Sequence, residues 1–141
     1  MNEIFTAFSG NVAGEPRRSA PGSENPRTVL RVATRPRVLD QASGQWRDGT
    51  PSFVTVVCWR ALAENVAASV GKGDPVVVTG RLRAGTYTAA DGQQRQSVEV
   101  HASSVGHDLS LGRAQFSWTS RAPAREAAGA ESGGGEKPMA A

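Results

Sequence analysis

Four aromatic residues stand in polar or cationic parts of the sequence, where a flat ring could stack on another flat ring. Phe53 and Trp59 are six residues apart in the run FVTVVCW, so they share one face of an extended chain. Tyr87 follows a basic stretch, and Trp46 lies in the polar segment DQASGQWRDG. Stacking of a nucleic-acid base on such a ring is worth about 1–3 kcal/mol. Packing in the core or between subunits is the alternative for each ring.

Arginine dominates the charge of the chain. Lys and Arg number 16 against 13 Asp and Glu, and six arginines fall within residues 17–37 beside a single acid, Glu24. Guanidinium groups fork onto phosphate and stack on bases, so a basic stripe favours a polyanionic partner. A solvated basic surface and the composition of a GC-rich genome are the alternatives. The cations expected to contact phosphate are Arg31, Arg35, Arg37, Arg47, Arg60, Lys72, Arg81, Arg83 and Arg95.

Signals for catalysis or metal binding fail when their spacing is checked. The run Gly71-Lys72-Gly73 lacks the G-x-x-x-x-G-K-[ST] frame of a phosphate loop and is predicted to be a helix stop and turn. His101 and His107 have no cysteine or acid partners at metal-ligand spacing. No nucleophile, base and orienting acid can be assembled. We therefore expect no enzymatic activity, no metal and no cofactor.

Five short runs rich in β-formers and one helical segment make up most of the chain. Strands are predicted at about 3–8 (continuing at Val12 after a Gly10-Asn11 turn), 28–35, 53–59, 76–82 and 97–102, the last burying Val98, Val100 and Ala102. Leu62, Val66 and Val70 recur at helical spacing in 61–70 before Gly71. This order, with one helix between strands three and four, is that of the OB-fold, an all-β five-stranded barrel that commonly binds oligonucleotides.

The segment that follows Gly80 resembles a hairpin with a mobile tip. Asp91-Gly92 is a turn signal flanked by polar residues, and Arg81, Arg83 and Tyr87 precede it. A basic, aromatic arm of this kind could fold over a bound strand.

The composition changes near Gly112 and divides the chain. We expect an OB domain at 1–112, a possible extra strand at 113–120 carrying Phe116 and Trp118, and a disordered tail at 121–141, rich in Ala, Gly, Pro and charge. No apolar run reaches membrane-spanning length and the N-terminus lacks signal-peptide features, so we expect no membrane association and a cytoplasmic, nucleoid-associated protein. Cys58, the single cysteine, is predicted to be a buried apolar residue.

Several segments together resemble the bacterial single-stranded DNA-binding protein family across about residues 1–112. These are Gly10-Asn11-Val12 with Glu15-Pro16, then LRVAT, then FVTVVCWRALAENVAASVGKGDPVVVTGRL, then DGQQRQSVEV and VGHDL. The resemblance implies an OB-fold, usually a homotetramer, that wraps single-stranded DNA by stacking bases on aromatics and pairing phosphates with Lys and Arg. It places stacking positions at Phe53, Trp59 and Tyr87.

The chain departs from that family in two places. The end of the second strand, where the family carries another aromatic, reads ATRPRVLD, so that contact is absent or replaced by Trp46. The family's acidic, aromatic-ended tip docks replication and repair enzymes, whereas this chain ends GGGEKPMAA. We therefore expect no docking of replication enzymes by that route, as in a secondary paralogue of the family.

The leading hypothesis is non-catalytic, sequence-nonspecific binding and protection of single-stranded DNA during replication, recombination or repair. Two alternatives stay open: an OB module that mainly binds proteins, and one that binds RNA, since stacking and phosphate contacts discriminate poorly between the two nucleic acids.

Overall fold

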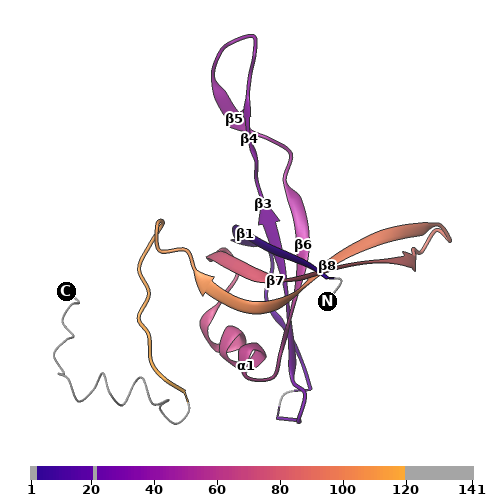
Figure 1. Cartoon of the computed structure of the whole chain (residues 1–141), viewed down its shortest axis with the longest axis vertical. Coiled ribbons are helices and arrows are strands. Elements are labelled where there is room, and N and C mark those ends of the chain that lie inside the picture. The colour runs from indigo at the N-terminus through magenta and orange to yellow at the C-terminus, as the bar shows by residue number, and fades with distance from the viewer. Residues whose placement is uncertain (1–2, 21, 120–141) are drawn as a thin grey trace.

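Strands that alternate apolar and polar residues curl into a barrel from which two hairpins project (Figure 1). The computed structural model describes residues 3–20 and 22–119. In chain order the elements are β1 (Ile4–Val12), β2 (Arg17–Ser19), β3 (Arg27–Thr34), β4 (Arg37–Leu39), β5 (Trp46–Asp48), β6 (Ser52–Trp59), α1 (Arg60–Ser69), β7 (Pro75–Thr88) and β8 (Gln94–His107).

The strand order closes the barrel. The main sheet runs β1-β7-β8-β6-β3-β2, and the additional pairing of β1 with β3 closes β1, β7, β8, β6 and β3 into a barrel, with β2 attached to β3. Neighbours are antiparallel except β6 and β8, which pair in parallel. The helix follows β6, the third strand of the barrel. The predicted all-β, five-stranded OB barrel with one helix before its fourth strand is therefore confirmed.

The inward residues of each strand form one core. Val32, Val56 and Val78 come from three different strands and have no exposed surface. Cys58 is also fully buried, as predicted, and this burial raises the pKa of its thiol to about 11. The remaining buried apolar residues of this cluster are Val12, Leu30, Ala63, Val66, Val70, Val76 and Val100.

The predicted turn at Gly10-Asn11 is wrong, because β1 continues through both residues. Asn11 pairs with Ala33 of β3 on one side and with Pro75 of β7 on the other, so the strand closes the barrel here. A Cβ on Gly10 would collide with the carbonyl oxygen of Ala33 and lie 2.8 Å from a methyl of Val32. Glycine at this position permits a close approach of two strands rather than a turn.

The β7–β8 hairpin extends far beyond the predicted strand ends and forms an arm (Figure 1). Its strands pair as far as Thr88 and Gln94, and Gly92 takes a positive φ of 82° in the predicted turn. The expectation that Val98 is buried is wrong: it is 43% exposed, because it lies on the arm outside the barrel, opposite Ala84.

A second hairpin, β4–β5, was not predicted. It places Leu39 opposite Trp46 and Arg37 opposite Asp48. The sequence around residues 37–48 has no apolar alternation that would indicate a strand. Residues 37–39 nevertheless pair with residues 46–48 above the end of β3 (Figure 1).

The helix begins and ends close to its predicted positions. Arg60, its first residue, has a positive φ of 59°, a strained conformation for a side chain other than glycine. Its backbone N–H donates to the carbonyl of Pro26 at 2.9 Å, which fixes the sharp change of direction after β6. After Ser69 the chain turns at Lys72 and Gly73, as predicted from Gly71-Lys72-Gly73.

Residues 113–119 form no strand, contrary to the expectation of an extra strand at 113–120. The rings of Phe116 and Trp118 instead contact each other edge to face, with centroids 5.2 Å apart. The tail predicted to be disordered, 121–141, lies outside the described residues. Within the described residues, no helix is long and apolar enough to span a membrane.

Candidate nucleic-acid interface

The outer face of β6 carries two exposed rings. Phe53 and Trp59 are 49% and 39% exposed, whereas Val56 and Cys58 on the opposite face are fully buried. The strand thus separates a packed face from an aromatic one, as the alternation predicted. Arg31 of β3 reaches across to Phe53, with its guanidinium carbon 4.8 Å from the ring centroid.

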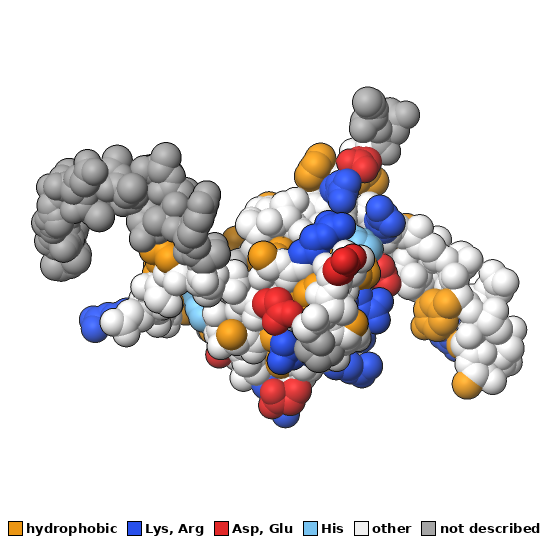
Figure 2. Space-filling view, turned by 90° about the horizontal axis from the view of Figure 1, so that it is seen from below, with side chains coloured by type: hydrophobic (Ala, Val, Ile, Leu, Met, Phe, Trp, Pro, Cys, Tyr) orange, Lys and Arg blue, Asp and Glu red, His pale blue; other side chains and the backbone are white. Residues whose placement is uncertain are grey.

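A groove of about 320 Å³ surrounds the second ring. Arg27, the register partner of Trp59, places its guanidinium carbon 5.8 Å from the indole centroid. On the other side the indole N–H donates to Nδ1 of His101 over 3.4 Å. The full lining is Arg17, Ser19, Arg27, Val29, Thr55, Val57, Trp59, Glu99 and His101. Figure 2 shows Lys and Arg side chains gathered around a histidine at the base of the arm.

The β7–β8 arm presents the third ring. Tyr87 is 50% exposed and lies opposite Arg95. At the tip, the Asp91 carboxylate accepts from the backbone N–H of Gln93 and from Arg95, which holds its pKa below the usual range. Tyr87 therefore lies on a hairpin whose turn is closed by hydrogen bonds to the Asp91 side chain.

The β4–β5 hairpin presents the fourth ring. Trp46 is 60% exposed, and the hairpin carries Arg37 and Arg47 beside it. Arg37 is partly engaged, with its Nε 3.7 Å from Asp48. The aromatic ring has no core to enter at this position, in agreement with the polar sequence around it.

All the cations predicted to contact phosphate have exposed side chains. Arg37, Arg81 and Arg95 each pair with an acid; the others form no ion pair with any acid that the structure describes. Lys72 differs from the other cations in its position. It lies in the turn between α1 and β7, so the length of the helix separates it from β6. The remaining predicted cations are Arg31, Arg35, Arg47, Arg60 and Arg83.

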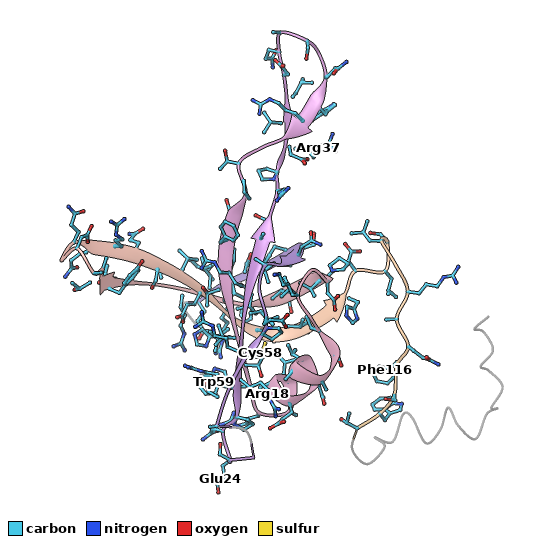
Figure 3. All side chains as sticks on the ribbon, turned by 180° about the vertical axis from the view of Figure 1, so that it is seen from behind. Arg18, Glu24, Arg37, Cys58, Trp59 and Phe116 are labelled. Atoms are coloured by element: carbon cyan, nitrogen blue, oxygen red, sulfur yellow. The ribbon has the colours of Figure 1, made fainter. Side chains whose placement is uncertain are left out.

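A larger cavity, about 460 Å³, lies between α1 and the segment after β8. Its walls include Leu62, Val66 and Phe116, and none of the described residues that line it is Arg or Lys. Trp59 lies on the arm side of the molecule, and Phe116 lies on the opposite side (Figure 3). This apolar cavity is therefore separate from the cationic, aromatic surface.

The whole barrel corresponds to a known family of proteins. Residues 1–108 match the single-strand binding protein family. The chain belongs to this family. It is 44% identical over 118 residues to single-stranded DNA-binding protein 2 of Streptomyces avermitilis. The aligned region covers 82% of this chain and 72% of that protein.

Two solved structures of similar proteins have the same fold. The small single-stranded DNA-binding protein of Streptomyces coelicolor superposes with a TM-score of 0.69 at 40% identity, over 79% of this chain and 100% of that one. The second single-stranded DNA-binding protein of Mycobacterium smegmatis superposes with a TM-score of 0.58 at 35% identity, over 82% of this chain and 99% of that one. The single-strand binding family is not enzymatic, and the described residues contain no group of three His, Cys, Asp or Glu placed to hold a metal ion.

Sequence reasoning missed part of the Trp59 groove in this single-strand binding fold. The basic stripe of the sequence includes Arg17 and Arg27 without indicating this groove, and the spacing of His101 argues against a metal site without indicating any other contact. Arg27 faces Trp59 through strand register, and His101 reaches it from β8, across a parallel pairing. Neither relationship is local in sequence. The only sequence feature that indicates this groove is the predicted exposed position of Trp59 on its strand.

Proposed function

We propose that this protein coats single-stranded DNA, stacking bases on Phe53, Trp59, Tyr87 and Trp46 while exposed arginines hold the phosphates. The observation that carries the proposal is the pairing of ring and cation on one face of the barrel. Arg31 lies against Phe53 and Arg27 lies against Trp59. The ring can stack on a base and the cation can bind the adjoining phosphate. Neither contact depends on which base is present.

The two hairpins extend this surface in different directions. Tyr87 with Arg83 and Arg95 lies on the β7–β8 arm, and Trp46 with Arg47 lies on the β4–β5 hairpin (Figure 1). Their rings are about as exposed as that of Phe53 or more so, which suits them to flat contact with bases. We propose that the strand runs across β6 and is flanked by both hairpins, with binding and protection at the nucleoid as the cellular role.

We further propose a homo-oligomer, most simply a tetramer. Ile4 and Phe5 on β1 are 61% and 69% exposed, and Val77 on the neighbouring β7 is 39% exposed. Among the strands that the structure describes, only β7 pairs with β1 over residues 4–10, so none of them occupies the other edge of β1, where apolar side chains are exposed. An unpaired edge of this kind favours pairing with a second copy. Light scattering at micromolar concentration tests it; a monomer mass would contradict it.

Titration with oligo-dT and oligo-U, followed by tryptophan emission, tests the nucleic-acid proposal. We expect quenching by oligo-dT, with an affinity that falls steeply as salt rises, because phosphate neutralisation releases counterions. Equal affinity for oligo-U would indicate an RNA-competent protein. No quenching by either would favour an OB module that binds proteins.

A further inference from the structure

The Trp59 side chain is the last member of a series of hydrogen bonds that begins on another strand. Glu99 Oε1 lies 3.1 Å from Nε2 of His101, and Nδ1 of His101 lies 3.4 Å from Nε1 of Trp59. Glu99 and His101 belong to β8, which pairs in parallel with β6 so that His101 lies opposite Val57. The orientation of the indole ring is thus tied to the neighbouring strand.

The chemistry of the three groups fixes the state of the imidazole. An indole N–H can only donate, so Nδ1 of His101 must be unprotonated to accept it. Nε2 then carries the proton and donates to the Glu99 carboxylate. The His101 side chain is 17% exposed, and its two partners are more open to water, with the Glu99 side chain 43% and Trp59 39% exposed.

We propose that His101 is a positioning residue for DNA binding: its neutral ring holds the Trp59 indole for stacking, and protonation of the ring releases it. Protonation would put a second donor at Nδ1, facing the indole N–H, and the hydrogen bond would be lost. This inference rests on the proposed role of Trp59 and assigns to His101 a function in orienting that ring.

Charges on each packed strand bear on the protonation of His101. The Glu99 carboxylate lies against Nε2 of the ring, and cations lie on three neighbouring strands. Arg81, opposite His101 on β7, is paired with Glu3 at 3.3 Å. The groups that face or flank the ring are Glu99 on β8, Arg81 on β7, Trp59 on β6, Arg27 on β3 and Arg17 on β2.

Protonation has two opposite consequences for DNA affinity. The added positive charge attracts phosphate, whereas the released indole stacks less well. Trp59→Phe separates them, because phenylalanine keeps a stacking ring but has no N–H for His101 to orient. Any pH dependence that survives in this variant reports charge alone.

The first test uses the DNA-free protein and the indole N–H signals of its three tryptophans in a ¹⁵N-correlated NMR spectrum. The Trp59 signal is the one missing from Trp59→Phe. We expect it to shift between about pH 8 and about pH 5, the range in which histidine changes charge. In His101→Asn, whose Oδ1 can take the place of Nδ1 without titrating, it should stay fixed. A wild-type signal that does not move, or that moves equally in His101→Asn, would overturn the inference.

The second test measures oligo-dT affinity at about pH 8 in matched variants. His101→Leu should weaken binding about three- to tenfold, the range of one net hydrogen bond, while His101→Asn should stay within about twofold of the natural protein. In a Trp59→Phe background the two variants should bind alike. Equal losses for Leu and Asn, or a Leu effect that persists in that background, would contradict the proposal. Should His101→Leu fail to fold, the NMR titration of the natural protein still decides.

The two proposals fail in different ways. If oligo-dT leaves the Trp59 signal unmoved at every pH, the stacking role of Trp59 is wrong, and the role of His101 in DNA binding fails with it. If oligo-dT moves the signal but pH does not, only the role of His101 is wrong.

Discussion

The guanidinium carbon of Arg31 lies 4.8 Å from the centroid of the Phe53 ring, although the two residues are on different strands. Their contact covers part of the ring, and 49% of the Phe53 surface stays exposed. A cation held against an exposed aromatic ring gives a base a surface to stack on and gives the adjoining phosphate a counter-charge.

Phe53→Ala should weaken oligo-dT binding by about 1–3 kcal/mol, because one stacking platform is removed. The melting temperature should change little, since the ring lies outside the barrel core. Fluorescence titration and thermal melting measure the two effects, with Phe53→Trp as the control that keeps a stacking ring. A sharp fall in melting temperature with unchanged affinity would show that Phe53 packs rather than binds.

Trp46→Ala should also weaken binding without loss of stability, because this ring is 60% exposed on the β4–β5 hairpin. Trp118→Ala is the matched control: its ring is 46% exposed but contacts Phe116, on the side of the molecule away from Trp59 (Figure 3). Equal losses of affinity for the two variants would show that the hairpin has no special part in binding.

The barrel was predictable because its strands are local patterns. Alternation in segments such as 53–59 identified both the buried residues and the exposed rings, and the helix followed from Leu62, Val66 and Val70. The β4–β5 hairpin escaped prediction because residues 37–39 and 46–48 pair without a buried face. The extra length of the arm escaped for the same reason, and Val98 was wrongly placed in the core because a valine on an exposed strand continues the apolar alternation.

Contacts between strands were the other part that sequence could not supply. Gly10 resembled a turn residue, yet its role comes from the approach of β3, which depends on barrel closure. Arg27 and His101 meet Trp59 only through the register of two pairings. Residue types alone identified the rings and cations but not which cation or histidine serves which ring.

Gly10→Ala should lower the free energy of unfolding by about 1–3 kcal/mol, the usual cost of forcing an extra group into a packed interior. The added Cβ would collide with the Ala33 backbone, which cannot move without opening the β1–β3 pairing. Gly14→Ala is the control, because a Cβ there meets nothing within 4 Å. Urea denaturation measures both, and equal stability of the two variants would contradict this account of barrel closure.

Cys58 should make stability depend on pH in the alkaline range. Burial raises its thiol pKa from 9.0 to about 11, so the folded protein holds the proton more tightly than the unfolded chain. This contribution is fully present below pH 9.0 and is lost as pH rises through 11. The free energy of unfolding should therefore fall by roughly 1–3 kcal/mol over that range.

Cys58→Ala isolates this contribution from the other groups that titrate at alkaline pH. Denaturation at several pH values should give a smaller fall for the variant than for the natural protein. Identical pH profiles would mean that the thiol does not contribute.

Photo-crosslinking to an oligonucleotide that carries 5-iododeoxyuridine in place of thymidine tests the central claim most directly, because it identifies the side chains that touch bases. We expect crosslinks at Phe53, Trp59, Tyr87 and Trp46, and their loss at high salt, where phosphate contacts weaken. Crosslinks confined to Phe116 and Trp118, or none at all, would contradict a DNA path across β6 and the two hairpins.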